Sequence, residues 1–460
     1  MPDCTFRSWL ISKRLPAPVA FPALKREFDQ NTTAMKTWTD EAERKKAAAD
    51  EAIETYLAPP PPKHGRVVGL DCHPDTFTAA VFRGQTPHDA RKLECRENLC
   101  LPRLLAWAKA EFTAEDLFLL EAGSNSFAVC EALEKLGLRA VVLESAHVGR
   151  HAKTYADNDR LAAARIALVY LAGNAPAVWV PDAQTRERRE LLHVYAKAVR
   201  DHTAASNALR AYLNGHAIRL GSRSLSAKPT RVWIDAQRAW SPLQKKMLEG
   251  YVSALEQSAE QRRRYLRMIC EEISKEPLML RLMKLLGVGK INAFGLLAVI
   301  GNARRFARPE KLVAYLGLNP GQRESGTGKR ISVGIGRRGR GDLRHLLIQG
   351  AQAILRMGKA TALGQWGWKL FARKGSRNVA VAAVARKLVV QVWHLLHGNP
   401  PTALEKDQSF TVKLKKLAVS IGKALRIELG LGATLHTSIE TLRNRVRDSS
   451  AYLADPIQPI

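Results

Sequence analysis

Three acidic residues stand where a metal ion could be held. Asp71 and Glu121 each come directly after a short apolar run typical of a buried strand, and Asp159 opens a helical pattern. Acids at strand ends are held rigidly at one edge of a sheet, and carboxylate oxygens are the ligands that Mg²⁺ prefers. Two such ions, about 4 Å apart, can activate an attacking oxygen and stabilise a leaving one during phosphodiester cleavage. Each acid taken singly is also typical of a turn or a helix cap, and Asp159 could be only an N-cap residue.

A second group of residues is suited to phosphate. Gly287, Gly289 and Lys290 belong to a short run, LGVGK, that precedes the apolar helical pattern 291–300. A glycine turn between two helices exposes backbone N–H groups that bind phosphate well, as in helix-hairpin-helix segments. A simple helix C-cap glycine is the alternative for the same pattern.

A cationic, glycine-rich stretch follows, with one serine inside it. Seven glycines fall between Gly321 and Gly341, and residues 301–350 hold eleven basic and three acidic residues. Such a loop lets the backbone approach a ligand closely while its cations neutralise phosphates. The cations expected to contact nucleic acid are Arg323, Lys329, Arg330, Arg337, Arg338 and Arg340. Ser325 could attack a phosphate if a base or metal removed its proton, whereas an isolated serine in such a loop is normally a turn residue.

The whole chain of 460 residues is strongly basic. It has 72 Lys and Arg against 43 Asp and Glu, a formal charge of +29 and a pI of about 10.2. This surplus predicts a polyanionic partner, and nucleic acid is the usual one. A structural basic protein with uniform, salt-sensitive binding is the alternative. The apolar share of 46% excludes wholesale disorder.

The sequence predicts neither a membrane partner nor an oxidising compartment. The longest apolar pattern, 291–300, is too short to span a bilayer, and the start of the chain lacks a secretory signal pattern. The six cysteines form no Cys-x-x-Cys pair and no zinc spacing with histidine, which predicts reduced thiols. We therefore expect a cytoplasmic protein.

The elements around the acidic residues predict an α/β domain at residues 63–180. Strands are expected at 67–70, 76–82, 117–120 and 140–143, and helices at 101–112 and 127–136. Such alternation is typical of an α/β fold. Residues 1–62 predict a helical N-terminal extension that ends in the proline linker 59–62.

Helices are expected to dominate the rest of the chain. A heptad seam with one polar member comprises Leu191, Tyr195, Ala198, His202, Ala205, Leu209 and Tyr212. With a second helical pattern at 242–274, it predicts a helical hairpin or coiled coil over 181–280, either a plain linker or a dimer contact. Residues 281–400 predict a mainly helical module that contains the serine loop, and residues 401–460 a helical tail.

These motifs resemble the DEDD transposases of the insertion sequence 110 family, which are related to Piv-type invertases. Residues 69–76 (GLDCHPDT) are similar to the family's first motif, residues 119–123 (LLEAG) to its second, and residues 153–160 (KTYADNDR) to its third. Residues 281–350 resemble its C-terminal transposase domain, including the Arg305-Phe306 pair and the run AYLGL. The resemblance covers roughly 66–180 and 281–360.

The resemblance implies a RuvC-like, RNase H-type domain, then a coiled-coil arm and a mainly helical transposase domain. It implies that Asp71, Glu121 and Asp159 bind Mg²⁺ and that Ser325 is the nucleophile that joins covalently to DNA. The implied partners are donor and target DNA, a structured noncoding bridge RNA that pairs with both, and further copies of the chain in a dimer or tetramer. The implied location is the bacterial cytoplasm, at the nucleoid.

The sequence departs from the family pattern at the fourth acid. That pattern places a second Asp three residues after the first, on one helix face, but the matching residue here is Ala162, which has no ligand atom. Asp157 and Asp75 are possible substitutes. A degenerate copy, a relocated ligand and an engineered inactivation all fit this change. Two rival functions stay open: a RuvC-like nuclease that cleaves branched DNA with water, and an impaired copy that acts as a nucleic-acid-binding regulator.

Overall fold

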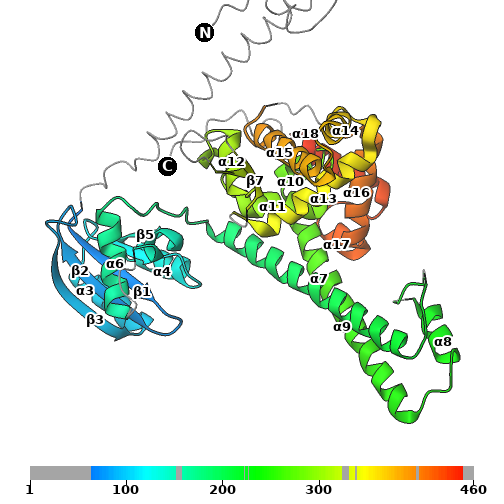
Figure 1. The fold of residues 1–460 in the computed structure, drawn as a ribbon, viewed down its shortest axis with the longest axis horizontal. Helices are drawn as coiled ribbons and strands as arrows, with labels where there is room; N and C mark the ends of the chain where they lie inside the picture. Colours follow the sequence, from blue (N-terminus) through cyan, green and yellow to red (C-terminus); the bar gives the residue numbers. More distant parts are fainter. Residues whose placement is uncertain are drawn as a thin grey trace, which may run out of the picture. The chain divides into compact units, whose positions relative to one another are not determined.

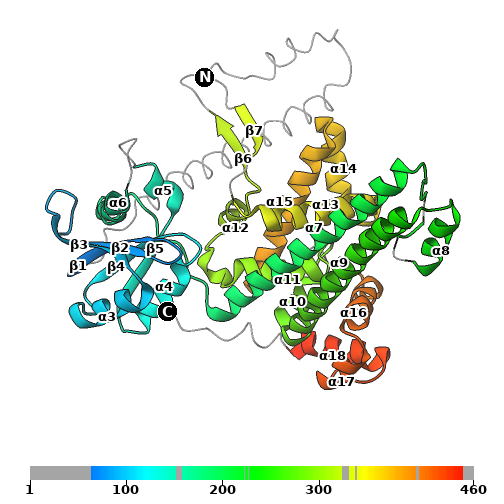
Figure 2. The same ribbon diagram turned by 90° about the horizontal axis from the view of Figure 1, so that it is seen from below.

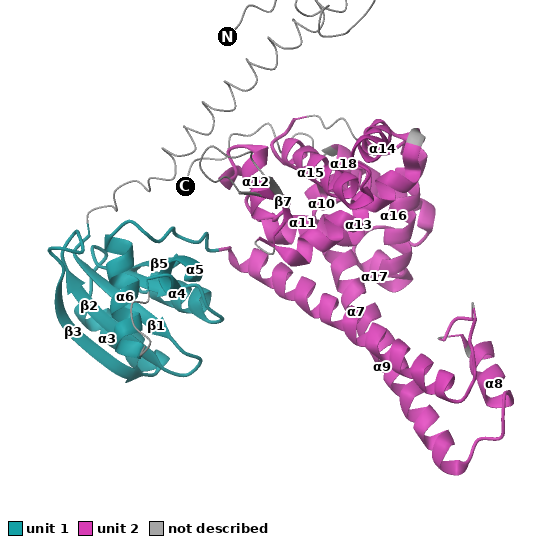
Figure 3. Cartoon of the chain, in the orientation of Figure 1, with its two compact units in different colours: residues 1–180 teal, residues 181–460 magenta. Residues whose placement is uncertain are grey.

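The computed structural model describes residues 64–151, 158–323 apart from 222 and 226, 331–336, 339–399 and 404–448. The chain divides into two compact units, residues 1–180 and 181–460 (Figure 3). The expected N-terminal extension 1–62 and the residues Asp157, Ser325, Lys329, Arg330, Arg337 and Arg338 lie outside the described residues.

Unit 1 is built on a five-stranded mixed sheet with the strand order β3-β2-β1-β4-β5. Its strands are β1 (Arg66–Cys72), β2 (Phe77–Arg83), β3 (Arg91–Leu99), β4 (Leu117–Glu121) and β5 (Arg139–Leu143). β1 pairs antiparallel with β2 and parallel with β4, and β4 pairs parallel with β5. The carboxyl ends of β1 and β4 therefore lie at the same edge of the sheet, next to each other.

Helices cover both faces of this sheet, as Figure 2 shows. α3 (Leu101–Glu111) and α4 (Ser126–Glu134) lie on one face, and α5 (Ser145–Gly149) and α6 (Asp159–Leu171) lie on the other. Consecutive strand residues point to opposite faces, so β1 supplies Val68 to the core under α3 and α4 and Val67 to the core under α6. Two thin apolar layers thus hold the sheet between its helices.

The contact between α6 and β1 is unusually close, and it depends on a glycine. A Cβ atom at Gly69 would lie 2.0 Å from the carbonyl oxygen of Ala163 and 3.0 Å from the backbone nitrogen of Ala167. The backbone of α6 therefore lies directly on the strand. Two strand residues span about 6.6 Å and four helix residues about 6 Å. The same contact therefore brings Asp159, four residues before Ala163, level with Asp71, two residues beyond Gly69.

Unit 2 begins with a long helical arm, which Figure 1 shows. α7 (Ala183–Gly215) and α9 (Pro242–Lys275) pack against each other, with the short α8 (Lys228–Ala236) between them in the chain. Every residue of the predicted heptad seam is buried or half-buried. The polar member, His202, contacts the hydroxyl of Ser258 on α9 at 3.3 Å. The seam thus joins two helices of one chain.

The rest of unit 2 is a helical body around α11 (Lys290–Ile300), which is buried from Ala293 to Ile300. Its other elements are α10 (Pro277–Leu282), α12 (Pro309–Tyr315), β6 (Pro320–Arg323), β7 (Ile331–Ile335), α13 (Gly341–Met357), α14 (Ala362–Lys374), α15 (Arg377–Leu396), α16 (Asp407–Ile421), α17 (Lys423–Glu428) and α18 (Leu435–Asp448). Among the described helices, α15 alone is long and apolar enough to cross a bilayer, and its Val384, Leu388 and Val392 are buried in the core of this unit.

The structure agrees with the predicted order of an α/β domain followed by a helical region. The four expected strands are present within two residues of their predicted bounds. Two features were not predicted. β3 is an edge strand rich in charged residues and therefore lacks an apolar pattern. β6 and β7 form an antiparallel pair at Pro320–Arg323 and Ile331–Ile335, two segments for which the sequence predicted no strand.

Substituting alanine for Gly69 tests the close contact of α6 with β1. The added methyl group would press on helix backbone, which cannot rotate away as a side chain can, so we expect Gly69→Ala to destabilise unit 1 by about 2–3 kcal/mol. Thermal or urea unfolding followed by circular dichroism measures this. Gly149→Ala is the matched control, because nothing lies within 4 Å of its added Cβ. An unchanged unfolding midpoint in Gly69→Ala would show that the two backbones are not in contact.

Candidate functional site

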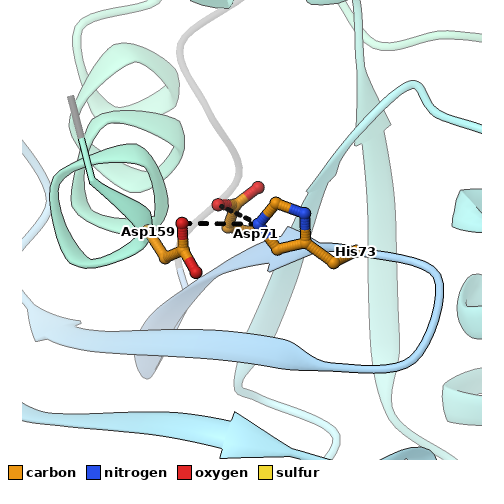
Figure 4. Close-up of side chains that lie close together, drawn as sticks. All are labelled: Asp71, His73 and Asp159. Carbon is orange, nitrogen blue, oxygen red and sulfur yellow. Dashed lines mark ion pairs between the residues drawn. The ribbon is translucent and has the colours of Figure 1, made fainter.

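Asp71, His73 and Asp159 meet at the carboxyl end of β1 (Figure 4). The Nε2 atom of His73 lies 3.5 Å from Oδ2 of Asp71 and 3.4 Å from Oδ1 of Asp159. One ligand atom from each residue lies within 4.8 Å of those of the other two. The structure therefore brings together two of the three predicted acids and adds a histidine that the sequence analysis did not assign to the site.

Asp159 is not the N-cap residue of α6, which was the alternative interpretation of its position. Asn158 is the N-cap of α6, and its Oδ1 accepts a hydrogen bond of 2.9 Å from the backbone N–H of Leu161. The helix end is thus satisfied by the preceding residue. The prediction that Asp159 could be only an N-cap residue is therefore wrong, and its carboxylate is directed to Asp71 and His73.

Glu121 ends β4, the strand beside β1. Burial and the charge of Asp71 raise the pKa of its carboxyl group, and Arg165 opposes the shift. Glu121 therefore lies within electrostatic reach of Asp71, although it does not belong to the close group of three. Burial and the charges of Asp71 and Glu121 also raise the pKa of the Cys72 thiol to about 12, so Cys72 remains a neutral thiol at neutral pH.

The place of the missing fourth acid is on the first turn of α6. Ala162 is half-buried, and its backbone N–H donates to the carbonyl oxygen of Asn158 over 2.9 Å. Asp75, one of the two suggested substitutes, has an exposed side chain and does not belong to the group of three.

One feature of the sequence could have indicated that His73 belongs to the site. In an extended chain, a residue two positions after Asp71 points to the same face as Asp71.

The backbone of His73 is held from two sides. Its N–H donates to the carbonyl oxygen of Thr76 over 3.0 Å, which closes the turn between β1 and β2. Its carbonyl oxygen accepts a 2.8 Å hydrogen bond from the side-chain amide of Asn125, at the start of α4. The turn and the residue before α4 together fix the backbone from which the imidazole extends.

The donor set suits a divalent cation. Two atoms that each lie about 2.1 Å from one ion are about 3.0–3.4 Å apart when the bonds meet at right or tetrahedral angles. The distances of 3.5 and 3.4 Å from His73 to the two carboxylates are close to this range. Asp71, Asp159 and His73 could therefore hold an ion after small side-chain movements, with Glu121 at its edge.

The glycine turn of unit 2 is a genuine bend between two helices. α10 ends with Met283 as its C-cap, so the interpretation of Gly287 as a C-cap is wrong. Gly287 has a φ of +72°, and an added Cβ would lie 2.6 Å from the carbonyl oxygen of Gly350 on α13. Gly289 is the N-cap of α11 and has no side-chain cap. The first N–H groups of α11 thus lack a capping side chain.

A cavity of about 700 Å³ opens beside this turn, against α16. Gly289, Lys290, Lys415 and Lys416 are among the residues that line it. The ammonium group of Lys290 donates to the hydroxyl of Ser420 on α16. Gly287, Gly289 and Lys290 all lie within the described residues, whereas four of the six cations predicted in the serine loop do not.

Of the cations predicted to contact nucleic acid around the serine loop, Arg323 and Arg340 lie within the described residues. Arg323 is the last residue of β6, where the chain enters the loop. Arg340 precedes α13, and its guanidinium donates two hydrogen bonds, of 3.2 and 2.8 Å, to the carboxylate of Asp342. Arg340 therefore has the carboxylate of Asp342 as its partner within unit 2.

The sequence of this chain is similar to those of known proteins. The sequence model described as Transposase IS116/IS110/IS902 family matches residues 279–364. The putative transposase y4qE of Sinorhizobium fredii is 28% identical over 60% of this chain and 74% of its own. The transposase for insertion sequence element IS1111A of Coxiella burnetii is 27% identical over 57% of this chain and 72% of its own. These matches agree with the resemblance seen in the motifs: residues 279–364 are similar to the IS116/IS110/IS902 family of transposases, and the relatives are named as transposases.

Neutralising Glu121 is expected to stabilise the protein at neutral pH. A carboxyl group whose pKa is higher in the folded than in the unfolded state contributes stability below its unfolded pKa and loses it as the pH rises through the folded one. Without added divalent cations, Glu121→Gln should therefore unfold at a higher temperature than the parent protein at pH 7. At about pH 4 the two proteins should unfold at nearly the same temperature, because Glu121 is then protonated in both the folded and the unfolded state of the parent. Glu115→Gln, at an exposed position, is the control and should leave the unfolding temperature unchanged at both pH values. An equal gain at both pH values would argue against the pKa shift.

Proposed function

We propose that this protein is an insertion-sequence transposase that cleaves and rejoins DNA, with Ser325 as the nucleophile. The observation that carries the proposal is that Asp71 and Asp159, from distant parts of the sequence, lie together at the edge of the five-stranded sheet where β4 ends in Glu121. The relatives that share 27–28% identity with the chain are named as transposases, which supports the same function.

The proposed chemistry is an exchange of phosphodiester bonds. The oxygen of Ser325 forms a bond to the scissile phosphorus while the bond from phosphorus to a sugar oxygen breaks. The serine loses its proton, and the departing sugar oxygen gains one. Reversal of the step with the sugar oxygen of another strand rejoins the DNA and frees the serine.

Asp71, Glu121 and Asp159 are the residues proposed to hold Mg²⁺. When bound, such an ion would promote loss of the serine proton and neutralise charge on the phosphate. Arg323, Lys329 and Arg330 would hold the DNA backbone by charge-assisted hydrogen bonds. Gly287, Gly289 and Lys290, at the start of α11, would bind a further phosphate.

The proposal includes RNA and other copies of the chain. A structured guide RNA, pairing with donor and target DNA, would supply sequence choice, and the charge of +29 suits a protein that holds two polyanions. The acids and the serine lie in different units of the chain, so a dimer or tetramer would allow them to meet between subunits. The place of action would be the bacterial cytoplasm.

A covalent adduct tests the nucleophile. We expect a protein–DNA adduct at Ser325 by mass spectrometry after incubation with substrate DNA, guide RNA and a divalent cation. Ser325→Ala should abolish both the adduct and strand joining, whereas Thr327→Ala in the same loop should keep them. Hydrolysis that survives in Ser325→Ala would favour the rival nuclease that uses water, and an adduct at another residue would remove the assignment.

Restoring the fourth acid tests the state of the site. Ala162→Asp adds a carboxylate one helical turn from Asp159, so we expect strand exchange in Mg²⁺ to rise about tenfold or more, in line with the usual effect of residues around a metal. Leu161→Asp is the control, because Leu161 is 48% exposed on the same turn of α6. If neither variant nor the parent exchanges strands but all bind nucleic acid, the regulator interpretation replaces the enzyme.

A further inference from the structure

The imidazole of His73 stands between the two carboxylates of the proposed metal site. Figure 4 shows its Nε2 atom directed to both Asp71 and Asp159, with the second ring nitrogen on the far side of the ring. The corresponding distances are 3.5 and 3.4 Å. Position 162 is an alanine and offers no ligand atom, and the third donor beside Asp71 and Asp159 in this group is the His73 imidazole.

We infer that His73 is itself a metal ligand, which takes over the role of the acid absent at Ala162, and that the site prefers Mn²⁺ to Mg²⁺. This inference rests on the proposed function for the identity of the site. It deepens that function by naming a ligand and a metal preference that follow from this chain's own residues.

The position of His73 supports a ligand role over a chance contact. Asp71, His73 and Asp159 offer one atom each within 4.8 Å of one another, close enough for a single ion. The hydrogen bonds to Thr76 and Asn125 hold the backbone of His73, so the Cα from which the imidazole extends toward Asp71 and Asp159 is fixed. A ligand whose backbone is already held has only its side-chain torsions to fix on binding.

The chemistry of the donors decides the metal. Mg²⁺ prefers oxygen ligands in near-ideal octahedral geometry, whereas an imidazole nitrogen favours first-row transition ions. Mn²⁺ accepts both carboxylates and imidazole and carries the same charge as Mg²⁺. A site with one nitrogen and two or three carboxylate groups therefore shifts its preference from Mg²⁺ to Mn²⁺.

The same contacts would also arise if a protonated His73 only bridged the two carboxylates as an internal cation. In that case His73 would leave the metal or compete with it, and its loss would strengthen metal binding. The two roles thus predict opposite effects of removing the imidazole, and a spectroscopic signal separates them directly.

The experiment uses the full-length chain without a histidine tag. Bound Mn²⁺ is observed by pulsed electron paramagnetic resonance, which detects coupling to a coordinated ¹⁴N nucleus, and Mg²⁺ competition gives the relative affinity. We expect one nitrogen-coupled Mn²⁺ in the parent protein. In His73→Asp the coupling should vanish and the preference for Mn²⁺ over Mg²⁺ should fall about tenfold or more, since even outer-shell partners of ligands change affinity about 10–100-fold.

Two further variants guard this result. His73→Gln keeps a neutral side chain of similar reach, and it should lose the nitrogen coupling even if His73→Asp folds poorly. His88→Asp, at an exposed position in the turn after β2, should behave as the parent does. Bound Mn²⁺ without nitrogen coupling, coupling that persists in both His73 variants, or tighter Mn²⁺ binding in the neutral variant His73→Gln would each overturn the inference.

The outcome is separable from the proposed function. A serine adduct formed without any nitrogen-coupled ion would support the transposase proposal and exclude His73 as a metal ligand. A nitrogen-coupled ion without any serine adduct would keep the ligand and remove the transposase chemistry. Failure of Mn²⁺ to bind the parent protein would also overturn the inference.

Discussion

The close packing of α6 on β1 at Gly69 is the constraint on which the candidate site depends. Because residue 69 has no side chain, the backbone of α6 lies directly against the strand. This contact brings the start of α6 to the end of β1, and Asn158 caps the helix there. Asp159 is thereby left free to face Asp71. A larger residue at position 69 would lift the helix and separate the two carboxylates.

The large positive charge is not all available to a nucleic acid. Lys413 on α16 is largely buried, and its ammonium donates to the carbonyl oxygens of Met283, Leu285 and Val288 at 2.7–3.0 Å. Glu405 pairs with it at 2.9 Å, which counters the lowering of the lysine pKa by burial. Arg189 likewise donates to the carbonyl oxygens of Ala298 and Val299 at the end of α11. Part of the basic surplus therefore joins helices, and only the remainder can form an interface.

Some elements were predictable because their local pattern was strong. The apolar runs of β1, β4 and β5 are bounded by turn residues, and the heptad seam of α7 is regular over seven positions. β3 could not be found in this way, because this edge strand has no fully buried residue and carries mostly charged side chains, so its sequence lacks an apolar pattern. His73 was visible in the first motif, but nothing in its neighbours indicated that a helix nearly ninety residues later would place a carboxylate beside it.

The sequence by itself determined the acids at strand ends, the glycine turn, the cationic serine loop and the family that these resemble, since each is a local pattern of residue types. Tertiary structure alone decided that Asp71 and Asp159 converge, that Asn158 rather than Asp159 caps α6, and that a histidine completes the group. The reason is physical: spacing along a chain sets the face on which a side chain lies, but only packing between elements sets the distance to a side chain from elsewhere.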